Sequence, residues 1–459
     1  MTKQFHALVL AAGKGTRFKS EKIKVLHTLM GKSMLKIVVD SISRLKPKMT
    51  HLIVGYQKEA LMEEFPGEEI SFITQKPQLG TAHAVMAASK TLSKYKGDDV
   101  LIMNGDLPLI SPQTLRPLLK QHQRQGNVLT FMSAEMADPY GFGRLVYLDK
   151  NRIRIIEEKD ATPEQRKIKK GNVGIYVFKI KDLIAALPKI SNKNIKGEYY
   201  LTDIIEILSS SGKKVGVHQT KYVREIVGVN DRFELAKAVK ALRMRKIESM
   251  ALKGVTFYDP ASTWIDFNVK IGRDTVIYPF VVLEGNSVIG KECTLYPGAH
   301  IINSSLGSGV KILSSTMIEG SRIADKTQIG PFTHLRPGNI IKTGAKVGNF
   351  VEMKNTVFGN RSKAGHLSYV GDSQVGKDVN IGAGTITCNY DGVKKNKTII
   401  DDKVFVGSGT QLVAPVKVGK GAYIGAGSTI TKDVSSEALA ITRTKQKEIE
   451  GWVRKKKKK

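Results

Sequence analysis

An aliphatic residue recurs every six positions through much of the second half of the chain, from about Ile265 to Ile430. An α-helix needs a period near 3.6 and an alternating strand a period of two, so neither accounts for the pattern. A six-residue step is typical of a parallel β-helix, in which each hexad forms one short flat side of a triangular prism. The inward-pointing positions are Ile271, Ile277, Leu283, Ile289, Leu295, Ile301, Leu306, Ile312, Ile318, Ile323, Ile329, Leu335, Ile341, Val347, Met353, Val375, Ile381, Val406, Leu412, Val418, Ile424 and Ile430.

The repeat is imperfect, and its imperfections are informative. The phase slips after Ile301 and again after Ile318. A glycine often follows the aliphatic residue, where we expect it to allow a tight corner. Two segments, 352–369 and 383–403, break the pattern. Loops that leave a solenoid usually mark a binding face, so we expect the chemistry of this half to lie there.

Bulk composition excludes several classes of protein. The 459 residues suffice for two or three domains, and no apolar run of membrane-spanning length or signal-peptide type is present. Cys293 and Cys388 lie outside metal and redox spacings, which indicates a reducing cytoplasm. The net charge of +31 raises nucleic acid or a membrane surface as partners. Because the only dense basic run is 454–459 and no nucleic-acid fold accompanies it, we interpret that run as a solvated tail.

The first half of the chain alternates strand-like and helix-like segments. Apolar runs of strand length occur at 6–12, 51–56, 100–103, 128–134 and 173–178, with helical patterns at 32–45 and 81–92. This order predicts a mostly parallel sheet covered on both faces. Ligands of such sheets bind beyond the carboxyl ends of the strands, so the residues that follow each strand are the candidates.

The loop after the first strand carries a candidate phosphate site. Glycines in the segment 10–17 let backbone N–H groups approach phosphates, and Arg17 and Lys24 add positive charge. The spacing is neither a Walker A loop nor a dinucleotide-binding motif. Asp106 follows the strand at 100–103, where a carboxylate could hold Mg²⁺ or form a turn into Pro108. Beside a phosphate loop we favour the metal.

These motifs resemble a known family. The set Leu10-Ala11-Ala12-Gly13, Gly15, Arg17 and Lys24 is similar to the signature of sugar-phosphate nucleotidyltransferases. Over essentially its whole length the chain resembles the bacterial bifunctional N-acetylglucosamine-1-phosphate uridyltransferases/glucosamine-1-phosphate acetyltransferases. Further motifs that carry the resemblance are Gln75 with Leu79 to Thr81, Gly105-Asp106, Tyr140 to Arg144, Glu157 to Asp160, Gly197 to Asp203, Gly228 to Asn230 and Ile381 to Gly392.

The resemblance implies a domain order and a biological role. It implies a Rossmann-like α/β uridyltransferase domain (1–230), a helical linker (231–253) and a left-handed parallel β-helix acetyltransferase domain (254–459). The linker also has a helical pattern of its own, with Leu235, Val239 and Leu242 on one face. The resemblance further implies a cytoplasmic homotrimer that makes UDP-N-acetylglucosamine for peptidoglycan and lipopolysaccharide lipid A.

For the first domain the resemblance implies one role for each matched residue. The substrates would be UTP and N-acetylglucosamine 1-phosphate, with Mg²⁺ as cofactor. Asn104 and Val173 depart from residues common in relatives, which removes an aromatic and a hydroxyl contact. The implied site comprises the loop Leu10, Ala11, Ala12 and Gly13, Arg17 and Lys24 at the phosphates, Gln75, Gly80 and Thr81 at uracil, Gly143, Glu157 and Asn172 at the sugar, and Asp106 and Asn230 at the metal.

For the second domain the resemblance implies acetyl transfer from acetyl-CoA to glucosamine 1-phosphate between β-helices of a trimer. His366 would be the base, and Glu352 could orient it. Acetyl-CoA would be bound by Ala383, Asn389, Tyr390, Ser408, Ala426 and Arg443. Glucosamine 1-phosphate would be bound by Arg336, Lys354, Tyr369, Asn380 and Lys395.

Three alternatives stay open at this point. The first is a single-activity nucleotidyltransferase whose β-helix serves only assembly. The second is a β-helix carbonic anhydrase with zinc on three histidines, for which His300, His334 and His366 are present but not close in sequence. The third is a scaffold or nucleic-acid binder that acts through the basic tail. Cys388 could act as an acyl carrier, but no histidine is near it in sequence, and we expect a buried thiol.

Overall fold

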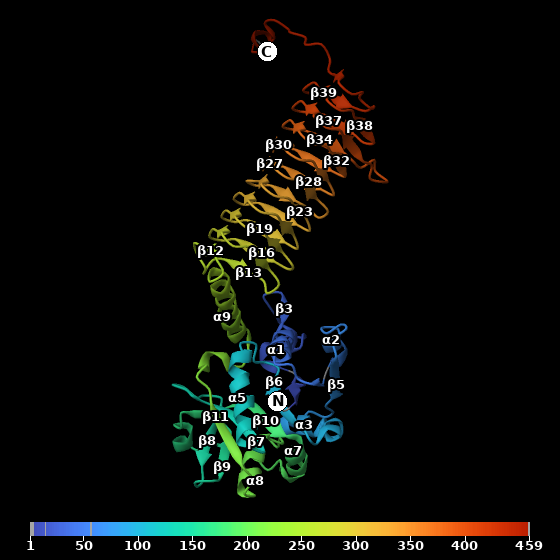
Figure 1. Cartoon of the computed structure of the whole chain (residues 1–459). Helices are drawn as coiled ribbons and strands as arrows, with labels where there is room; N and C mark the ends of the chain where they lie inside the picture. Colours follow the sequence, from blue (N-terminus) through green and yellow to red (C-terminus); the bar gives the residue numbers. More distant parts are fainter. Residues whose placement is uncertain (1–3, 14, 56, 458–459) are drawn as a thin grey trace. The chain divides into compact units, whose positions relative to one another are not determined.

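The computed structural model describes residues 4–13, 15–55 and 57–457. Lys14 of the phosphate loop, Tyr56 at the end of an expected strand, and Lys458 and Lys459 of the tail therefore lie outside the described residues. The chain divides into two compact units, Met1–Leu242 and Arg243–Lys459 (Figure 1).

The first unit contains a mixed, mostly parallel sheet. Among the described residues nine strands take part, in the order β11-β7-β10-β6-β1-β4-β5 with β8 and β9 attached to β10. Only β10 and its attached pair run antiparallel to their neighbours, so the prediction of a mostly parallel sheet is confirmed. The strands are β1 (Phe5–Leu10), β4 (Thr50–Val54), β5 (Ile70–Thr74), β6 (Asp99–Asn104), β7 (Leu129–Glu135), β8 (Gly143–Tyr147), β9 (Ile153–Ile156), β10 (Lys170–Lys179) and β11 (Val215–Gln219).

Helices cover both faces of this sheet, because successive strand residues point to opposite sides and both sides are apolar. One buried cluster joins Val9 of β1 to residues of α1 and α5, and another joins Leu8 to residues of α3, α7 and α8. The helices are α1 (Met34–Ser43), α2 (Lys58–Met62), α3 (Thr81–Ala87), α4 (Ser89–Leu92), α5 (Pro112–Gln125), α6 (Pro163–Arg166), α7 (Ile180–Ala186) and α8 (Asp203–Ser210). A short hairpin, β2 (Thr28–Leu29) and β3 (Lys32–Ser33), precedes α1.

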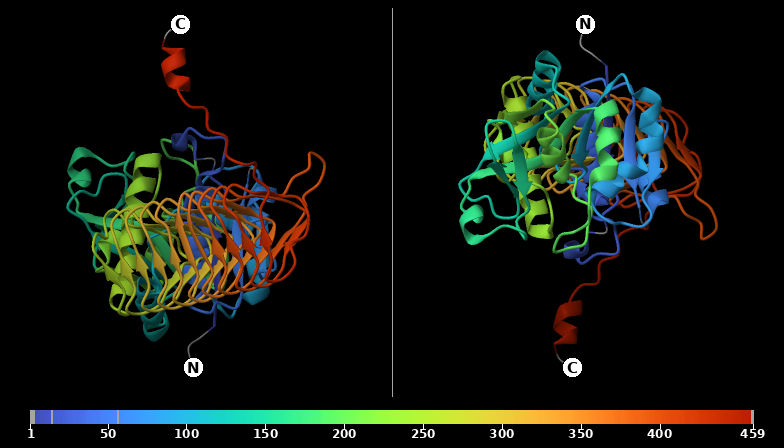
Figure 2. Two further views of the ribbon diagram at one scale, coloured as in Figure 1. Left: turned by 90° about the horizontal axis from the view of Figure 1, so that it is seen from above. Right: turned by 90° about the horizontal axis from the view of Figure 1, so that it is seen from below.

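The second unit is a parallel β-helix whose coils stack side by side (Figure 2, left). Its three sheets form three faces. Face 1 contains β12 (Thr256–Phe257), β15 (Val276–Ile277), β18 (Thr294–Leu295), β21 (Lys311–Ile312), β24 (Gln328–Ile329), β27 (Lys346–Asn349), β30 (Lys363–His366), β33 (Asn380–Ile381), β36 (Phe405–Val406), β39 (Tyr423–Ile424) and β41 (Leu439–Ala440). Face 2 contains β13 (Trp264–Ile265), β16 (Val282–Glu284), β19 (His300–Ile302), β22 (Met317–Glu319), β25 (His334–Leu335), β28 (Glu352–Lys354), β31 (Tyr369–Gly371), β34 (Ile386–Cys388), β37 (Gln411–Val413) and β40 (Thr429–Ile430). Face 3 contains β14 (Lys270–Ile271), β17 (Val288–Ile289), β20 (Ser305–Leu306), β23 (Arg322–Ile323), β26 (Ile340–Ile341), β29 (Val357–Phe358), β32 (Ser373–Val375), β35 (Thr398–Ile400) and β38 (Val416–Val418).

The phase slips of the repeat come from one corner of the prism. Where Leu283 on face 2 leads to Ile289 on face 3, the step is six residues, and both side chains are buried. The step from Ile301 to Leu306 is one residue shorter, yet both of these side chains are also buried. A corner can therefore lose a residue while the inward position is kept. We expected the segment 352–369 to be irregular. That prediction is wrong, because the segment forms β28 to β31 and keeps the register of the other coils.

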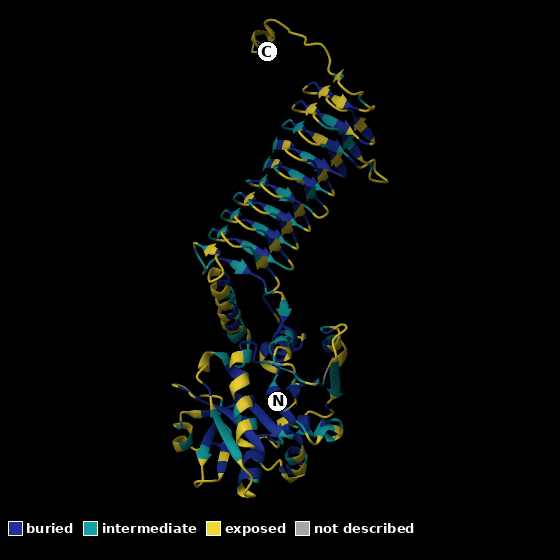
Figure 3. Cartoon of the chain, viewed as in Figure 1, coloured by how far each residue is buried: buried dark blue, intermediate teal, exposed yellow. Residues whose placement is uncertain are grey.

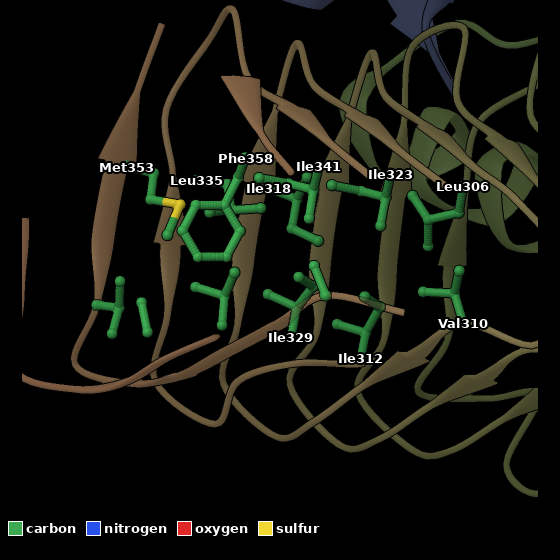
Figure 4. Packing of buried hydrophobic residues seen from close by; sticks show 14 of the residues in the cluster. Leu306, Val310, Ile312, Ile318, Ile323, Ile329, Leu335, Ile341, Met353 and Phe358 are labelled. Carbon is green, nitrogen blue, oxygen red and sulfur yellow. The ribbon is translucent and has the colours of Figure 1, made fainter. Parts of the chain in front are cut away.

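The interior of the β-helix is a continuous column of aliphatic residues. Figure 4 shows Ile318, Ile329, Leu335 and their neighbours pointing into the prism from successive coils. Glycines that follow such aliphatic residues lie where neighbouring coils approach closely. A Cβ added at Gly272 would lie 2.7 Å from the carbonyl carbon of Gly290 in the next coil, which no L side chain can do without displacing the backbone.

One long helix and one insertion complete the chain. Helix α9 (Arg232–Ala251) lies within the expected helical segment, and Lys246 Nζ near its end donates to the carbonyls of Phe267 and Val269 in the β-helix. The second expected break is shorter than 383–403. Residues 389–397 alone leave the coil between β34 and β35, and a bridge between Tyr390 and Lys395 closes this insertion.

We predict that Phe358→Ala lowers the unfolding free energy of the second unit by about 3–5 kcal/mol, because it leaves a large cavity among aliphatic side chains. Phe358 is 0% exposed, whereas its neighbour Val357 on β29 is 36% exposed. Val357→Ala is therefore the matched control, with an expected loss below about 1 kcal/mol. Urea unfolding followed by circular dichroism measures both, and equal losses would contradict the inward orientation of Phe358.

Candidate functional sites

In the first unit, the carboxyl ends of two parallel strands bring two loops together. Leu10 at the end of β1 pairs with Asn104 at the end of β6, and the Gly105 N–H donates to the Leu10 carbonyl at 2.9 Å. The glycine-containing loop after β1 and the turn that carries Asp106 therefore begin side by side.

Two adjoining cavities open at this edge. Cavity A has a volume of about 470 Å³ and cavity B about 400 Å³. Every residue predicted to contact UTP lines cavity A, and every residue predicted to contact the sugar lines cavity B. The lining of A includes Leu10, Ala11, Ala12, Gly13, Arg17, Lys24, Gln75, Gly80, Thr81, Asp106 and Asn230, and that of B includes Gly143, Glu157 and Asn172. Both cavities share Leu10, Arg17, Thr81, Asn104, Asp106 and Asn230. Arg17, Asp106 and Asn230 therefore lie at their junction, and Lys24, which lines cavity A, reaches the junction through its contact with Asp106.

At the junction each cation is matched with an oxygen. Lys24 Nζ lies 2.6 Å from Asp106 Oδ2, and Arg17 donates to Asn230 Oδ1 at 2.8 Å. Glu234, in the first turn of α9, accepts from the Asn230 backbone N–H at 2.6 Å and holds that residue in place. A point at the Cβ position of Gly228 lies within 4 Å of both the Asp106 and the Asn230 side chain.

Such a pair of oxygens suits a divalent cation. Mg²⁺ is usually held by one or two protein oxygens while phosphates and water complete its octahedron. Asp106 and Asn230 supply one carboxylate and one amide oxygen, and both already attract positive groups. Among the described residues, no group of three or more His, Cys, Asp and Glu is arranged to hold a metal.

The backbone around Gln75 explains the glycine at position 80. Gln75 is buried, and its Nε2 donates to the Gly80 carbonyl at 3.2 Å. Gly80 has φ 110°, and a Cβ there would lie 2.6 Å from the Tyr199 carbonyl oxygen. Only glycine fits this position without strain. The turn places Thr81 at the first position of α3, beside cavity A.

The polar groups of cavity B are preorganised by buried neighbours. Thr202 donates its hydroxyl to Glu157 Oε1 at 2.8 Å, and burial raises the pKa of Glu157 despite this bond. Asn172 Nδ2 donates to the Tyr176 hydroxyl at 2.8 Å. A Cβ at Gly143 would lie 2.6 Å from the Ile155 side chain, so any other residue here would have to displace that side chain.

Several cavity residues were missed by the sequence reasoning. Lys196 and Glu198 also line cavity A, and Tyr140 and Thr202 line cavity B. Motifs around Tyr140 and Glu198 were noted for their resemblance alone. Nothing in their spacing indicates which side chains would face a ligand, because they lie on loops whose course only the tertiary structure defines.

In the second unit, five residues share one corner row beside face 1. Ile381 pairs with Val406 and Val406 with Ile424, so Ala383, Ser408 and Ala426 occupy equivalent places on three successive coils. His366 pairs with Asn349 and precedes Ala383 in this row. His366 Nδ1 lies 2.7 Å from Asn349 Oδ1. Arg443 donates to the Ala426 carbonyl at 3.0 Å.

Within one chain, His366 and Glu352 have different partners. Glu352 lies on face 2, where its carboxylate accepts from Arg336 at 3.2 Å. Pairing between successive coils brings Asn349 to the histidine, and a role of Glu352 in orienting or charge-balancing His366 stays a prediction.

Cationic side chains gather on face 2. Arg336 and Lys354 occupy the same position on consecutive coils, one place after the paired residues Leu335 and Met353. The side chain of Lys395, from the insertion 389–397, lowers the pKa of Lys354, and the charge of Arg336 lowers it further. Two lysines and an arginine this close favour an anion.

The remaining predicted residues are spread over two faces. Tyr369 follows Glu352 on face 2, whereas Asn380 lies on face 1 between Lys363 and Phe405. Asn389 is buried and donates to Asp372 Oδ2 at 2.5 Å, and Tyr390 donates to the Gly392 carbonyl at 2.6 Å.

The cysteine prediction also needs a correction. Cys388 is half-buried, since it follows the inward-facing Thr387 on β34 and so points outward. Cys293 is the fully buried thiol.

Comparisons with known proteins agree with both halves. A family model described as "Nucleotidyl transferase" matches residues 6–266, and one described as "Bacterial transferase hexapeptide (six repeats)" matches 268–303 and 397–432. These matches and the stacked sheets confirm the predicted nucleotidyltransferase domain and left-handed β-helix.

Similar full-length proteins carry one common name, "Bifunctional protein GlmU". The protein of that name from Thermotoga maritima is 48% identical over 98% of this chain and 99% of its own length. Those from Syntrophomonas wolfei and Shouchella clausii are each 44% identical, covering 96% and 98% of this chain and 98% of their own lengths. A solved structure of UDP-glucose pyrophosphorylase with UDP-glucose covers 53% of this chain and 99% of its own at 16% identity and a TM-score of 0.44, too low to support an argument.

We predict a pH-dependent stabilisation from Asp203→Asn. Burial, followed by the charge of Glu157, raises the pKa of Asp203 to about 6. The pKa of the carboxyl in the unfolded chain is about 3.9. Between this pKa and that of the folded state, the folded state binds more protons, so the unfolding free energy falls as pH rises through this range. Asp203→Asn should raise the unfolding free energy by about 1–2 kcal/mol at pH 7.5, after allowance for partial exposure, and by less at pH 5. Urea titrations at both pH values measure this. A pH-independent change, or the same change in the exposed control Asp138→Asn, would contradict it.

Proposed function

Because the chain belongs to the family of bifunctional GlmU proteins, we propose that each of its two units holds one of two transferase sites. The chain acetylates glucosamine 1-phosphate with acetyl-CoA and transfers UMP from UTP to the resulting N-acetylglucosamine 1-phosphate, with release of pyrophosphate. A single-activity enzyme with a structural β-helix is not favoured. We assign uridyl transfer to residues 1–230, acetyl transfer to 254–459 and the connection to 231–253. We also propose a cytoplasmic location.

The observation that carries the uridyltransferase assignment is the junction of cavities A and B. UTP in cavity A and the sugar phosphate in cavity B would meet where Arg17, Lys24, Asp106 and Asn230 lie. A phosphate oxygen of N-acetylglucosamine 1-phosphate forms a bond to the α-phosphorus of UTP, and the bond from that phosphorus to the pyrophosphate oxygen breaks. The nucleophile is already an anion, so no base is required, and positioning beside cations supplies most of the catalysis.

The side chains of the two cavities have separate tasks in this proposal. Backbone N–H groups of the loop 10–13 approach the phosphates, and Arg17 and Lys24 neutralise them. Gln75, Gly80 and Thr81 contact uracil. Gly143, Glu157 and Asn172 hold the sugar.

We propose Asp106 and Asn230 as the protein ligands of Mg²⁺. When bound, the ion would neutralise charge on the phosphates during transfer. The pairs Lys24–Asp106 and Arg17–Asn230 would then exchange partners, which frees both cations for phosphate oxygens.

We propose His366 as the base of acetyl transfer. The Asn349 Oδ1 atom accepts a hydrogen bond, so His366 carries its proton on Nδ1 and leaves Nε2 free. As the substrate nitrogen attacks the thioester carbonyl, Nε2 takes the proton from that nitrogen, and the carbon–sulfur bond breaks to release CoA. The corner row supports the proposed acetyl-CoA site, because Ala383, Ser408 and Ala426 continue it away from His366.

Placement on two faces supports a trimeric acetyltransferase. Arg336, Lys354, Lys395 and Tyr369 would bind the sugar phosphate on face 2, whereas Asn380 lies on face 1. Asn380 begins β33 of face 1, whereas Arg336, Lys354 and Tyr369 point outward from strands of face 2 or the residue after one. We therefore propose that Asn380 reaches the site of a neighbouring chain, as packing of β-helices in a trimer would allow.

Substitutions at the two sites should separate the two activities. His366→Ala should lower thiol release from acetyl-CoA with glucosamine 1-phosphate by about 10²–10⁴-fold, since it removes a general base, and should spare pyrophosphate formation. Asp106→Ala should have the opposite effect. If His366→Ala retained full thiol release, the acetyltransferase assignment would fall, and if Asp106→Ala retained pyrophosphate formation, the uridyltransferase assignment would.

We also propose that Lys196 contacts a substrate phosphate in cavity A. Its charge also acts on Glu157 of cavity B, which puts it close to the junction. Lys196→Gln should lower kcat/KM for pyrophosphate formation by about tenfold, the loss of one charge-assisted hydrogen bond. Lys193→Gln, on the same loop and also exposed, is the matched control and should have little effect. Equal effects of the two would indicate only a general loss of positive charge.

A further inference from the structure

The C-terminal tail is a structural feature that neither transferase site uses. Every described residue from 441 to 457 is exposed, and the tail is yellow along its length in Figure 3. Arg443 is the last residue assigned to the acetyl-CoA site. Beyond it, the only helix in the described part is the short α10 (Trp452–Lys456).

Three large apolar side chains of this tail point into solvent. Ile449, Trp452 and Val453 are 57%, 53% and 60% exposed. Trp452 and Val453 begin α10, and Ile449 lies three residues before Trp452. The backbone N–H of Trp452 donates to the carbonyl of Ile449 at 3.4 Å, which connects Ile449 to the start of the helix. A cluster of this kind is costly to leave in water and indicates a partner surface.

Cations lie directly beside this apolar cluster. Lys456 Nζ lies 4.9 Å from the centre of the Trp452 ring, and the sequence 454–459 consists of one arginine and five lysines. The partner must therefore offer both negative charge and an apolar environment for an indole. A nucleic acid offers the first, but Ile449 and Val453 have no use in base stacking. The headgroup region of an anionic bilayer offers both.

We propose that the tail binds the surface of an anionic lipid bilayer, with Trp452 and Val453 in the headgroup region and the basic residues Arg454 to Lys457 at the phosphates. A short apolar contact combined with a polybasic segment is the two-signal arrangement that gives reversible attachment. The tail lies on the membrane and does not span it, and no described helix has the length and apolar content to cross a bilayer.

The test is co-sedimentation of the full-length protein with two kinds of vesicle. One is made of phosphatidylcholine alone, and the other also contains about 30% phosphatidylglycerol, an anionic lipid. We expect binding only to the anionic vesicles, reversal at high salt, and about a hundredfold weaker partitioning for Arg454→Gln/Lys455→Gln/Lys456→Gln. Lys150→Gln/Lys167→Gln/Lys169→Gln removes the same charge from exposed positions of the first unit and should bind as before.

Insertion of the indole has its own readout. The chain contains two tryptophans, so Trp264→Phe leaves Trp452 as the single reporter, and its emission should shift to shorter wavelength on anionic vesicles. Equal binding to both vesicle types, no emission shift, equal effects of the two triple substitutions, or displacement from vesicles by duplex DNA at equal phosphate would overturn the proposal. A Trp452→Ala variant that loses thiol release but binds vesicles unchanged would also overturn the proposal, because Trp452 would then serve the acetyltransferase site and not the membrane.

Discussion

Hydrogen bonding between consecutive coils is the constraint on which the β-helix depends. Each strand pairs with the strand one coil before and one coil after it, so a residue's neighbours are set by the length of a coil. Thr294 pairs with Lys311 and Lys311 with Gln328, 17 residues apart in each case. This register stacks the aliphatic residues into one dry column and, by the same pairing, lines up outward residues in rows. The proposed base His366 and three of the proposed acetyl-CoA contacts, Ala383, Ser408 and Ala426, share such a row.

The first unit uses strand pairing for a similar purpose at one edge of a sheet. Pairing of β1 with β6 brings a phosphate loop and a carboxylate together before any ligand binds. Cations and oxygens at the junction of the cavities then satisfy one another, which keeps the site ordered at low electrostatic cost. Buried neighbours such as Thr202 and Tyr176 hold the polar groups of the sugar cavity in the same way. The site is thus prepared by contacts that a substrate would replace.

Much of this could be predicted because the relevant signals are local. The six-residue period remains recognisable even where the step between inward positions is five residues, so the sequence predicts the β-helix. The five predicted strands of the first unit differ from their predicted ranges by a few residues at most, whereas β5, β8, β9 and β11 were not predicted. The errors share one cause. The segment 352–369 was expected to be irregular, and Cys388 was expected to be buried. To avoid these errors, one would have to know how the residues of adjacent coils pair and which side chains therefore point inward.

The sequence by itself determined the periodic interior of the second unit, the alternating α/β order of the first and the chemical types available at each strand end. These follow from backbone periodicity and residue chemistry, which act over a few neighbouring residues. Only the tertiary structure decided that Asn349 is the partner of His366, that Lys196 lines the nucleotide cavity, and that Asn380 and Lys354 face different sides of the prism. Those relations depend on register between segments distant in sequence, and register is set by the sum of packing and hydrogen bonding across whole coils rather than by any local motif.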